Sequence, residues 1–313
     1  EEVIASYFEE FFTDRRSKKL LKDENEIKDF TKFNGNAQGF RVLSKLQVLQ
    51  DTYGLNLTYG TLSAYLKYPY LSNELKSTGF RKKLGVFQSE KQLLNNIRQE
   101  TGLNEIRHPL AFLMEAADSI CYLTMDLEDG FNRGFYSFGE VEKYLIDNGN
   151  NALKTKLSDF LSKNSKALNS EINRERTSIV KLRIFLIQEL VNLALENFLS
   201  NIDVIEAGNY SKELIKDDNK NGFAEILGNF CFENVYKQRE IESLELTGCS
   251  VIRGLFDHFV PALMYNDIKA DKLYNLISRS LRTIVELETG KDELSKIPNY
   301  YICLLYTSDA ADE

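Results

Sequence analysis

A predicted helix over residues 110–127 carries polar side chains at spacings that place them on one side. At about 100° per residue, the members of this polar stripe fall within about 100° of one another; they are Glu115, Asp118, Ser119, Tyr122, Asp126 and Asp129. Most other positions of this helix are apolar, whereas a surface helix normally has a wider polar face. The stripe therefore indicates either a polar seam that faces a cleft or the solvated edge of a core helix.

Two carboxylates of the stripe are too far apart to bind one metal ion together. Asp118 and Asp126 are eight residues apart, which at a rise of about 1.5 Å per residue separates their Cα atoms by about 12 Å. A site on this stripe would be elongated, with one carboxylate for a cation and the other for a hydroxyl or cationic group. Tyr122 lies between them and offers a flat face for packing.

A second group of residues could bind phosphate. Lys67 and Tyr68 precede a segment that ends in Arg81, Lys82 and Lys83, and such positive charge could neutralise a polyphosphate. The alternative is a solvated surface, which is the usual place for lysines. The sequence has no Walker A motif and no GxGxxG motif, so the nucleotide-binding loops with known mechanics are absent.

Composition excludes several classes of protein. The chain has 313 residues, of which 43% are hydrophobic, and a formal charge of −8; it is neither disordered nor collagen-like, and the net charge disfavours broad nucleic-acid binding. Its apolar runs are far shorter than the roughly 20 residues that cross a bilayer, so no membrane partner and a cytoplasmic location are expected. The four cysteines form no CxxC pair and are expected to be buried. With only two histidines, no HExxH helix can be written.

The elements that position these residues are predicted to be helices. Prolines are scarce and apolar residues recur at spacings of three and four, which indicates an all-α fold. Helices are expected over residues 1–12, 37–50, 89–100, 110–127, 169–199, 222–237, 241–263 and 272–287, with loops at 33–36, 147–150 and 217–222. Residues 303–313 resemble the translation of a synthetic sequencing adapter. We therefore expect this tail to be non-native.

Four ordered segments resemble one family. Residues 107–122 read RHPLAFLMEAADSICY and residues 126–130 read DLEDG. Together they closely resemble the HPL…EAADDICY…DLEDG signature of the deoxyguanosine triphosphate triphosphohydrolases, within the HD-domain phosphohydrolases. Residues 35–41 (GNAQGFR), residues 55–59 with 66–69 (LNLTY and LKYP) and residues 83–90 (KLGVFQSE) resemble three further family segments in the same order. The resemblance implies an all-α, HD-domain-type helical phosphohydrolase.

The resemblance assigns roles to the polar stripe. Family members hold a divalent metal, Mg²⁺ or Mn²⁺, and Asp118 occupies the place of one of its ligands. Tyr122 matches a tyrosine that packs on the deoxyribose, and Asp126 matches an aspartate that binds the sugar 3′-hydroxyl. These roles agree with an elongated site in which one carboxylate binds the metal and the other binds the sugar.

The resemblance also implies which residues bind the phosphates. Lys67, Tyr68 and Lys83 match groups that contact the triphosphate, and Asn36 matches a residue that faces the nucleotide. Two positions depart from the family, because Asn34 stands where the family usually has Glu and Ser119 where it usually has a second Asp. Neither position is expected to be a metal ligand.

Parts of the family's site are not found in this sequence. No His-Asp dipeptide occurs; the family's His and His-Asp segment, with its general-acid histidine, is expected before Glu1. A C-terminal family segment of the nucleotide site is also missing. We therefore expect residues 1–302 to form a single helical domain that is truncated at both ends, an interior fragment that is inactive by itself.

The function implied for the intact protein is dNTP hydrolysis, with dGTP as the expected substrate. A metal-activated water would attack the α-phosphorus and release deoxynucleoside and inorganic triphosphate. The resemblance also implies a homo-oligomer. The alternatives are a catalytically silent HD-like module that binds nucleotide or single-stranded nucleic acid as a regulator, and a purely structural helical protein.

Overall fold

All regular secondary structure in the described part of the chain is helical. The computed structural model describes residues 1–19, 21, 23–47, 54–77, 79–164, 171–216, 222–265, 270–279, 282 and 284, and these residues contain no strand. The prediction of an all-α fold is confirmed. The chain divides into two compact units: unit 1 comprises Glu1–Ala111 with Leu246–Glu313, and unit 2 comprises Phe112–Glu245. One domain over residues 1–302 stays a prediction.

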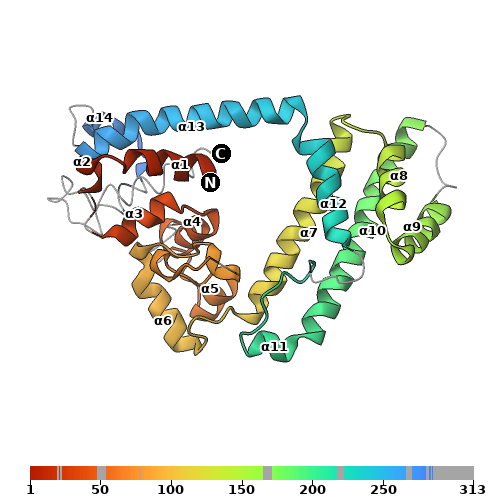
Figure 1. Ribbon diagram of the computed structural model, residues 1–313, viewed down its shortest axis with the longest axis horizontal. Coiled ribbons are helices and arrows are strands. Elements are labelled where there is room, and N and C mark those ends of the chain that lie inside the picture. The colour runs from red at the N-terminus through yellow and green to blue at the C-terminus, as the bar shows by residue number, and fades with distance from the viewer. Residues whose placement is uncertain are drawn as a thin grey trace. The chain divides into compact units, whose positions relative to one another are not determined.

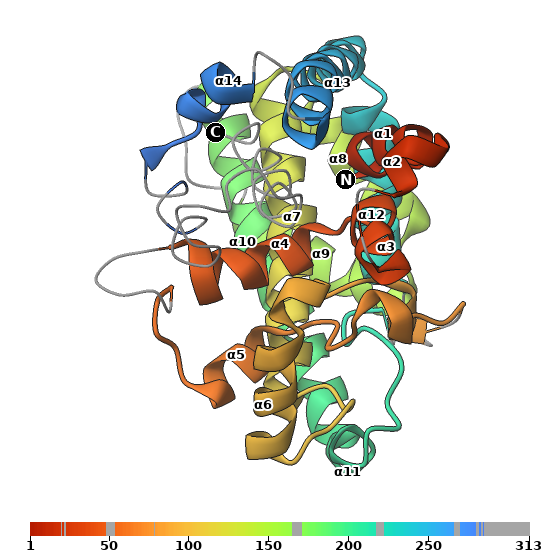
Figure 2. The same cartoon turned by 90° about the vertical axis from the view of Figure 1, so that its left-hand side faces the viewer.

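Unit 1 is built from short helices and turns that pack around apolar clusters. Its helices are α1 (Glu2–Phe11), α2 (Arg15–Lys18), α3 (Glu24–Thr31), α4 (Gly35–Arg41), α5 (Tyr59–Tyr65), α6 (Lys91–Thr101) and α14 (Ala270–Leu276). A π-helical turn η1 (Val42–Leu46) extends α4, and the 3₁₀ turns are η2 (Ser72–Glu74), η3 (Gly79–Lys82) and η4 (Gln88–Glu90). One cluster joins α1 to Phe256 and Val260 of α13 (Arg239–Tyr265). In another cluster, Phe40 packs with leucines of α5 and α6. In both views α4, α5 and α6 lie one below the other, in that order (Figures 1 and 2).

Unit 2 is a bundle of longer helices. Its helices are α7 (Pro109–Asn132, which begins in unit 1), α8 (Phe138–Asn148), α9 (Asn151–Asn164), α10 (Glu171–Ser200), α11 (Ile202–Glu206) and α12 (Phe223–Cys231), followed by a π-helical turn η5 (Phe232–Tyr236) and the start of α13. Buried leucines of α7 and α10 form much of its core. The ion pair between Glu128 and Arg183 joins these two helices.

The two longest helices and several others were predicted, whereas α2, α3, α5, α8, α9 and α11 were missed. α1, α7, α10 and α13 lie where the sequence predicts them, and α7 extends to Asn132. The helix expected over residues 37–50 begins earlier, at Gly35, because the Asn34 side chain accepts the Asn36 N–H and caps the first turn. The predicted loop at 33–36 is therefore partly helical. Residues 48–50 and the tail at 303–313 lie outside the described residues.

Two further expectations concern the cysteines and the membrane. Cys231 is buried, but Cys121 is exposed and Cys249 is partly exposed, so the expectation of buried cysteines is wrong at Cys121. Cys121 lies on the side of α7 away from the buried Ile120 and Leu123. Within the described ranges, none of the helices is long and apolar enough to cross a bilayer.

Candidate functional site

The polar stripe of α7 is only partly accessible. Asp118, Tyr122 and Asp129 are exposed and Asp126 is half-buried, whereas Glu115 and Ser119 are buried. We call Asp118, Tyr122 and Asp126 the acidic face. Partial burial raises the pKa of the Tyr122 hydroxyl, and the neighbouring Asp118 and Asp126 carboxylates raise it further. Tyr122 therefore keeps its proton at neutral pH and can donate a hydrogen bond.

Asp126 is held by a tyrosine far away in the sequence. Tyr236, the last residue of η5, donates a hydrogen bond to the Asp126 carboxylate. Burial raises the pKa of the Tyr236 hydroxyl, and the hydrogen bond with Asp126 raises it further, so the tyrosine remains the donor. This contact fixes the orientation of the Asp126 carboxylate.

A glycine at the end of the DLEDG segment allows η5 to approach α7 closely. A Cβ atom on Gly130 would lie 2.7 Å from Val235 Cγ2 and 2.8 Å from the Tyr136 hydroxyl. Any side chain at this position would push η5 away from the helix. Because Val235 precedes Tyr236, the glycine is one reason that the tyrosine reaches Asp126.

One cation of unit 2 lies near the acidic face. Lys216 Nζ lies 2.9 Å from Glu213 Oε1, and its positive charge opposes the rise in the pKa of Tyr122. The lysine is therefore close enough to Tyr122 to act on it electrostatically.

Cations and aromatic rings of unit 1 form a compact group around Tyr68. Lys83 Nζ lies 5.5 Å from the centre of the buried Tyr68 ring, and Arg107 Cζ lies 5.9 Å from it and 4.0 Å from the Phe80 ring. Such distances are typical of cation–π contacts. We call Tyr68, Phe80, Lys83 and Arg107 the basic cluster. It brings together Tyr68 and Lys83, two of the residues predicted to bind phosphate.

The basic cluster depends on a close backbone contact. The Gly85 N–H donates to the Tyr70 carbonyl at 3.1 Å, and a Cβ atom on Gly85 would overlap the Tyr68 carbonyl. Only glycine allows the KLGVF segment to lie this close to the KYPY segment. The close approach of the two segments therefore depends on Gly85.

The other two residues of unit 1 that are predicted to bind substrate lie near helix ends. Lys67 is half-buried and follows Leu66, the C-cap residue of α5. Asn36 is half-buried in the first turn of α4, where its amide donates to Asn34 Oδ1 at 2.9 Å. In the same turn Gln38 is buried, and neither its Nε2 nor its Oε1 has a hydrogen-bond partner among the described residues. Buried amides are normally satisfied, so Gln38 marks this turn as a place for a polar ligand or water.

The described residues do not build a metal site by themselves. Within them no three His, Cys, Asp or Glu side chains are grouped closely enough to hold an ion. Asp118 alone offers one carboxylate, whereas Mg²⁺ and Mn²⁺ need several ligands or retained waters. The role of Asp118 as a metal ligand stays a prediction.

Sequence reasoning missed two residues beside the predicted ones. Tyr236 contacts Asp126 across 110 positions of the sequence, and no spacing rule connects them. Arg107 belongs to the segment that carries the family resemblance, yet only the structure shows it against Phe80. The predicted roles of Asn36, Lys67, Tyr68, Lys83, Tyr122 and Asp126 in substrate binding stay predictions.

Curated relatives share long stretches of this sequence. A deoxyguanosinetriphosphate triphosphohydrolase-like protein of Listeria monocytogenes is 34% identical over 261 residues, which cover 82% of this chain and 56% of the relative. A protein of the same description from Pseudomonas aeruginosa is 38% identical over 198 residues, or 61% of this chain and 43% of the relative. One from Synechocystis sp. is 29% identical over 315 residues, or 96% and 68%.

These similarities and the fold define the class of protein. No family model matches the sequence. The all-helical architecture agrees with the HD-type helical class, to which the resemblance of the four segments points. The chain belongs to the deoxyguanosinetriphosphate triphosphohydrolase family. It spans about half the length of the first relatives that it matches.

Proposed function

We propose that the protein hydrolyses dNTPs, with dGTP as the preferred substrate, and releases deoxynucleoside and inorganic triphosphate. The observation that carries the proposal is the basic cluster, in which Lys83 and Arg107 flank the Tyr68 ring. The names of the relatives support the same activity. In this reaction water attacks the α-phosphorus, the bond between that phosphorus and the 5′-oxygen breaks, and the oxygen takes up a proton.

In this proposal the basic cluster and Lys67 bind the triphosphate. Phosphate oxygens carry several negative charges, and lysine and arginine side chains offset that charge with charge-assisted hydrogen bonds. Asn36 donates its amide to the nucleotide from the first turn of α4. The buried Gln38, with unfilled hydrogen-bonding capacity, supports a polar ligand beside that turn.

The acidic face binds the deoxyribose in the same proposal. Tyr122 packs its ring on the sugar, and Asp126 accepts a hydrogen bond from the 3′-hydroxyl. The hydrogen bond from Tyr236 supports this role, because it holds the carboxylate in one orientation. Asp118 would supply one ligand to a divalent ion, but the described residues do not complete such a site. Sugar binding by Tyr122 and Asp126 does not depend on that ion.

The test is a product and isotope analysis with the full-length protein, dGTP and Mn²⁺. We expect deoxyguanosine and triphosphate by ion-exchange chromatography. In H₂¹⁸O the label should enter triphosphate, because water attacks phosphorus and not the 5′-carbon. Release of dGMP and pyrophosphate would contradict the proposal. Tight dGTP binding without any turnover would favour the alternative of a catalytically silent nucleotide-binding module.

A further inference from the structure

A largely buried ion pair lies directly behind the segment that carries Tyr68. Arg98 of α6 donates from Nη1 to Glu74 Oε1 at 2.8 Å and from Nη2 to Glu74 Oε2 at 2.7 Å. The Arg98 and Glu74 side chains are only 14% and 20% exposed. Two parallel charge-assisted hydrogen bonds between a guanidinium and a carboxylate fix orientation as well as distance. The pair therefore connects α6 firmly to η2.

Both members of the pair also bind the backbone of the KYPY segment and of the residue that follows it. Arg98 Nη2 donates to the Pro69 carbonyl at 2.7 Å, and the Leu71 N–H donates to Glu74 Oε2 at 2.9 Å. Burial opposes ionisation of Glu74, but the hydrogen bonds from Arg98 and the Leu71 N–H hold the pKa of its carboxyl below the usual value. The chain is therefore held on both sides of Tyr70 by a charged pair.

Backbone contacts hold the same segment from another direction. The Tyr70 carbonyl accepts the Gly85 N–H at 3.1 Å and the Val86 N–H at 3.3 Å, and the Tyr70 N–H donates to the Tyr68 carbonyl at 2.8 Å. The backbone on either side of Tyr70 thus has partners in α6, in η2 and in the KLGVF segment. Because Tyr68 directly precedes Pro69, the position of its ring depends on these contacts.

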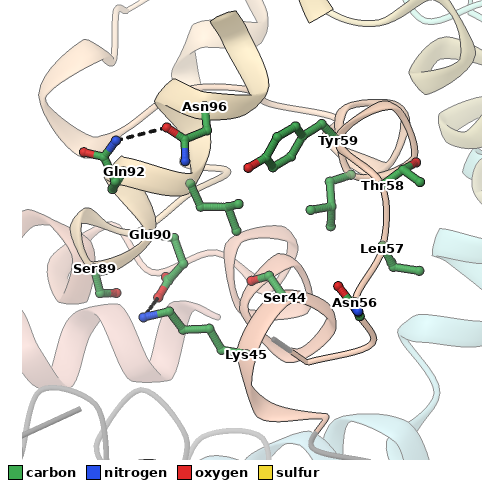
Figure 3. Close-up of a pocket in the computed structure, with 12 residues that line it drawn as sticks. Ser44, Lys45, Asn56, Leu57, Thr58, Tyr59, Ser89, Glu90, Gln92 and Asn96 are labelled. Atoms are coloured by element: carbon green, nitrogen blue, oxygen red, sulfur yellow. Dashed lines mark hydrogen bonds and ion pairs between the residues drawn. The ribbon is translucent and has the colours of Figure 1, made fainter. Parts of the chain in front are cut away.

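Helix α6 is a firm base for the ion pair, and it also offers a control position. Leu94 and Ile97 are buried in the apolar cluster of α5 and α6. Figure 3 shows a different face of α6, on which the Gln92 amide donates to Asn96 Oδ1 at 3.0 Å at the wall of a cavity. Arg98 does not line that cavity. Contacts on the two faces of α6 can therefore be removed separately.

We propose that Arg98 and Glu74 are positioning residues for the triphosphate, because they hold the KYPY segment in the conformation that places the Tyr68 ring beside Lys83 and Arg107. The pair does not contact the substrate and acts through Tyr68. This inference rests on the proposed function, in which the basic cluster binds the triphosphate. Groups that bind the substrate and the transition state equally affect KM and not kcat. Loss of the pair should therefore appear mainly in KM.

The first experiment measures dGTP hydrolysis by the full-length protein and its inhibition by inorganic triphosphate, which carries the phosphates without the nucleoside. Arg98→Gln should raise both KM and the inhibition constant by roughly tenfold and leave kcat within about threefold, since misplacing a binding group by about 1 Å can cost about 100-fold. Arg98→Lys keeps the charge but not the paired geometry and should have a smaller effect. Asn96→Ala removes the acceptor of Gln92 on the cavity face and should change neither constant. An unchanged KM in Arg98→Gln, or a fall in kcat alone, would overturn the proposal.

The second experiment separates positioning from a general loss of stability. Tyr68→Leu removes the ring but keeps an apolar side chain in this buried position. If the pair acts through Tyr68, Arg98→Gln should raise KM much less in the Tyr68→Leu background than in the wild type. Its effect on the melting temperature should persist in both backgrounds. Equal effects on KM in the two backgrounds would overturn the proposal. If a variant with Arg98→Gln failed to fold, as judged by its circular dichroism melt, Arg98→Lys would take its place in the comparison.

Failure of the proposed function would give a different result. A wild-type protein that did not hydrolyse dGTP would contradict that function. The affinity for inorganic triphosphate, measured by calorimetry on the same variants, would then decide the role of Arg98 and Glu74. We expect the roughly tenfold loss in Arg98→Gln there as well. Equal triphosphate affinity of the wild type and Arg98→Gln, or no triphosphate binding by the wild type, would overturn the proposal.

Discussion

The two groups of predicted site residues are built in different ways. The acidic face lies on one long helix, α7, so the positions of Asp118, Tyr122 and Asp126 follow from the helical period. The basic cluster lies on turns and segment ends, and a backbone contact between residues distant in sequence holds Tyr68 near Lys83. A helix therefore presents its groups at fixed intervals, whereas the cluster depends on a few contacts that single substitutions can break.

The largest effect is expected on the acidic face at its predicted metal ligand. Asp118→Asn is nearly isosteric and should leave the fold intact. It should lower kcat/KM for dGTP by roughly 100-fold or more. Even the substitution of residues that only hydrogen-bond to metal ligands lowers metal affinity or activity by about 10- to 100-fold. Calorimetry with Mn²⁺ and hydrolysis assays on the full-length protein check this, with the exposed Asp129→Asn as control. Unchanged Mn²⁺ affinity would exclude Asp118 as a ligand.

The next effect concerns sugar selection on the same face. A Tyr122 ring packed on C2′ leaves a 2′-hydroxyl without space or partner, which costs roughly 1–3 kcal/mol. Tyr122→Ala should therefore lower the ratio of kcat/KM for dGTP to kcat/KM for GTP by about tenfold to a hundredfold. Met125→Ala removes another exposed side chain of α7 and should not change the ratio. A ratio that stays constant in Tyr122→Ala would place the sugar elsewhere.

The basic cluster should be sensitive to one methyl group in its backbone contact. Gly85→Ala introduces an atom that overlaps the Tyr68 carbonyl, so it should lower the free energy of unfolding by about 1–3 kcal/mol. Thermal and urea unfolding measure the change. Gly60→Ala is the control in the same unit, because the nearest atom to its Cβ would be 3.9 Å away and alanine favours helix. Equal stability of the two variants would show that the KYPY and KLGVF segments can move apart without lowering the free energy of unfolding.

A smaller effect tests how the acidic face is held. Tyr236→Phe removes the hydrogen bond to Asp126 and should lower kcat/KM for dGTP by about tenfold, since a hydrogen bond to a charged group contributes roughly 1.5–3 kcal/mol. Mn²⁺ affinity should not change. Tyr144→Phe is the control, because Tyr144 contacts the Phe230 ring in the same unit and not Asp126. If both variants keep wild-type kinetics, Asp126 needs no support from Tyr236.

The smallest effect is a pH dependence at the start of α7. His108 Nδ1 accepts the Leu110 N–H at 3.1 Å, and burial lowers the pKa of His108 below its usual 6.5. The folded state therefore binds fewer protons than the unfolded state. The contribution of His108 to the free energy of unfolding is thus present above about pH 6.5 and decreases as the pH falls. His108→Asn keeps an acceptor without titrating. The melting temperature of the wild type should fall relative to this variant between about pH 7.5 and 5.5; parallel curves would contradict the assignment.

Patterns along the sequence predicted the helices and their faces better than the contacts between them. The apolar repeat locates α7 and α10, because long amphipathic helices carry their burial pattern in their own residues. The short helices α3 and α5 have too few turns for a clear repeat. Tyr236 could not be predicted to contact Asp126, because the approach of η5 to α7 depends on Gly130 and tertiary packing.

The contact at Gly85 also determines which length changes unit 1 can accept. The KYPY and KLGVF segments meet through backbone atoms, and the chain between them carries the turns η2 and η3 and the Phe80 ring of the basic cluster. A Cβ atom on Gly79, within that stretch of chain, would have no neighbour within 4 Å. Lengthening a surface loop costs little entropy. Residues inserted on the N-terminal side of Gly79 should therefore leave Tyr68 and Lys83 in place, whereas an insertion after it would displace Phe80 from Arg107. The N-terminal side of Gly79 is thus a suitable position for a reporter tag or a fluorescent label.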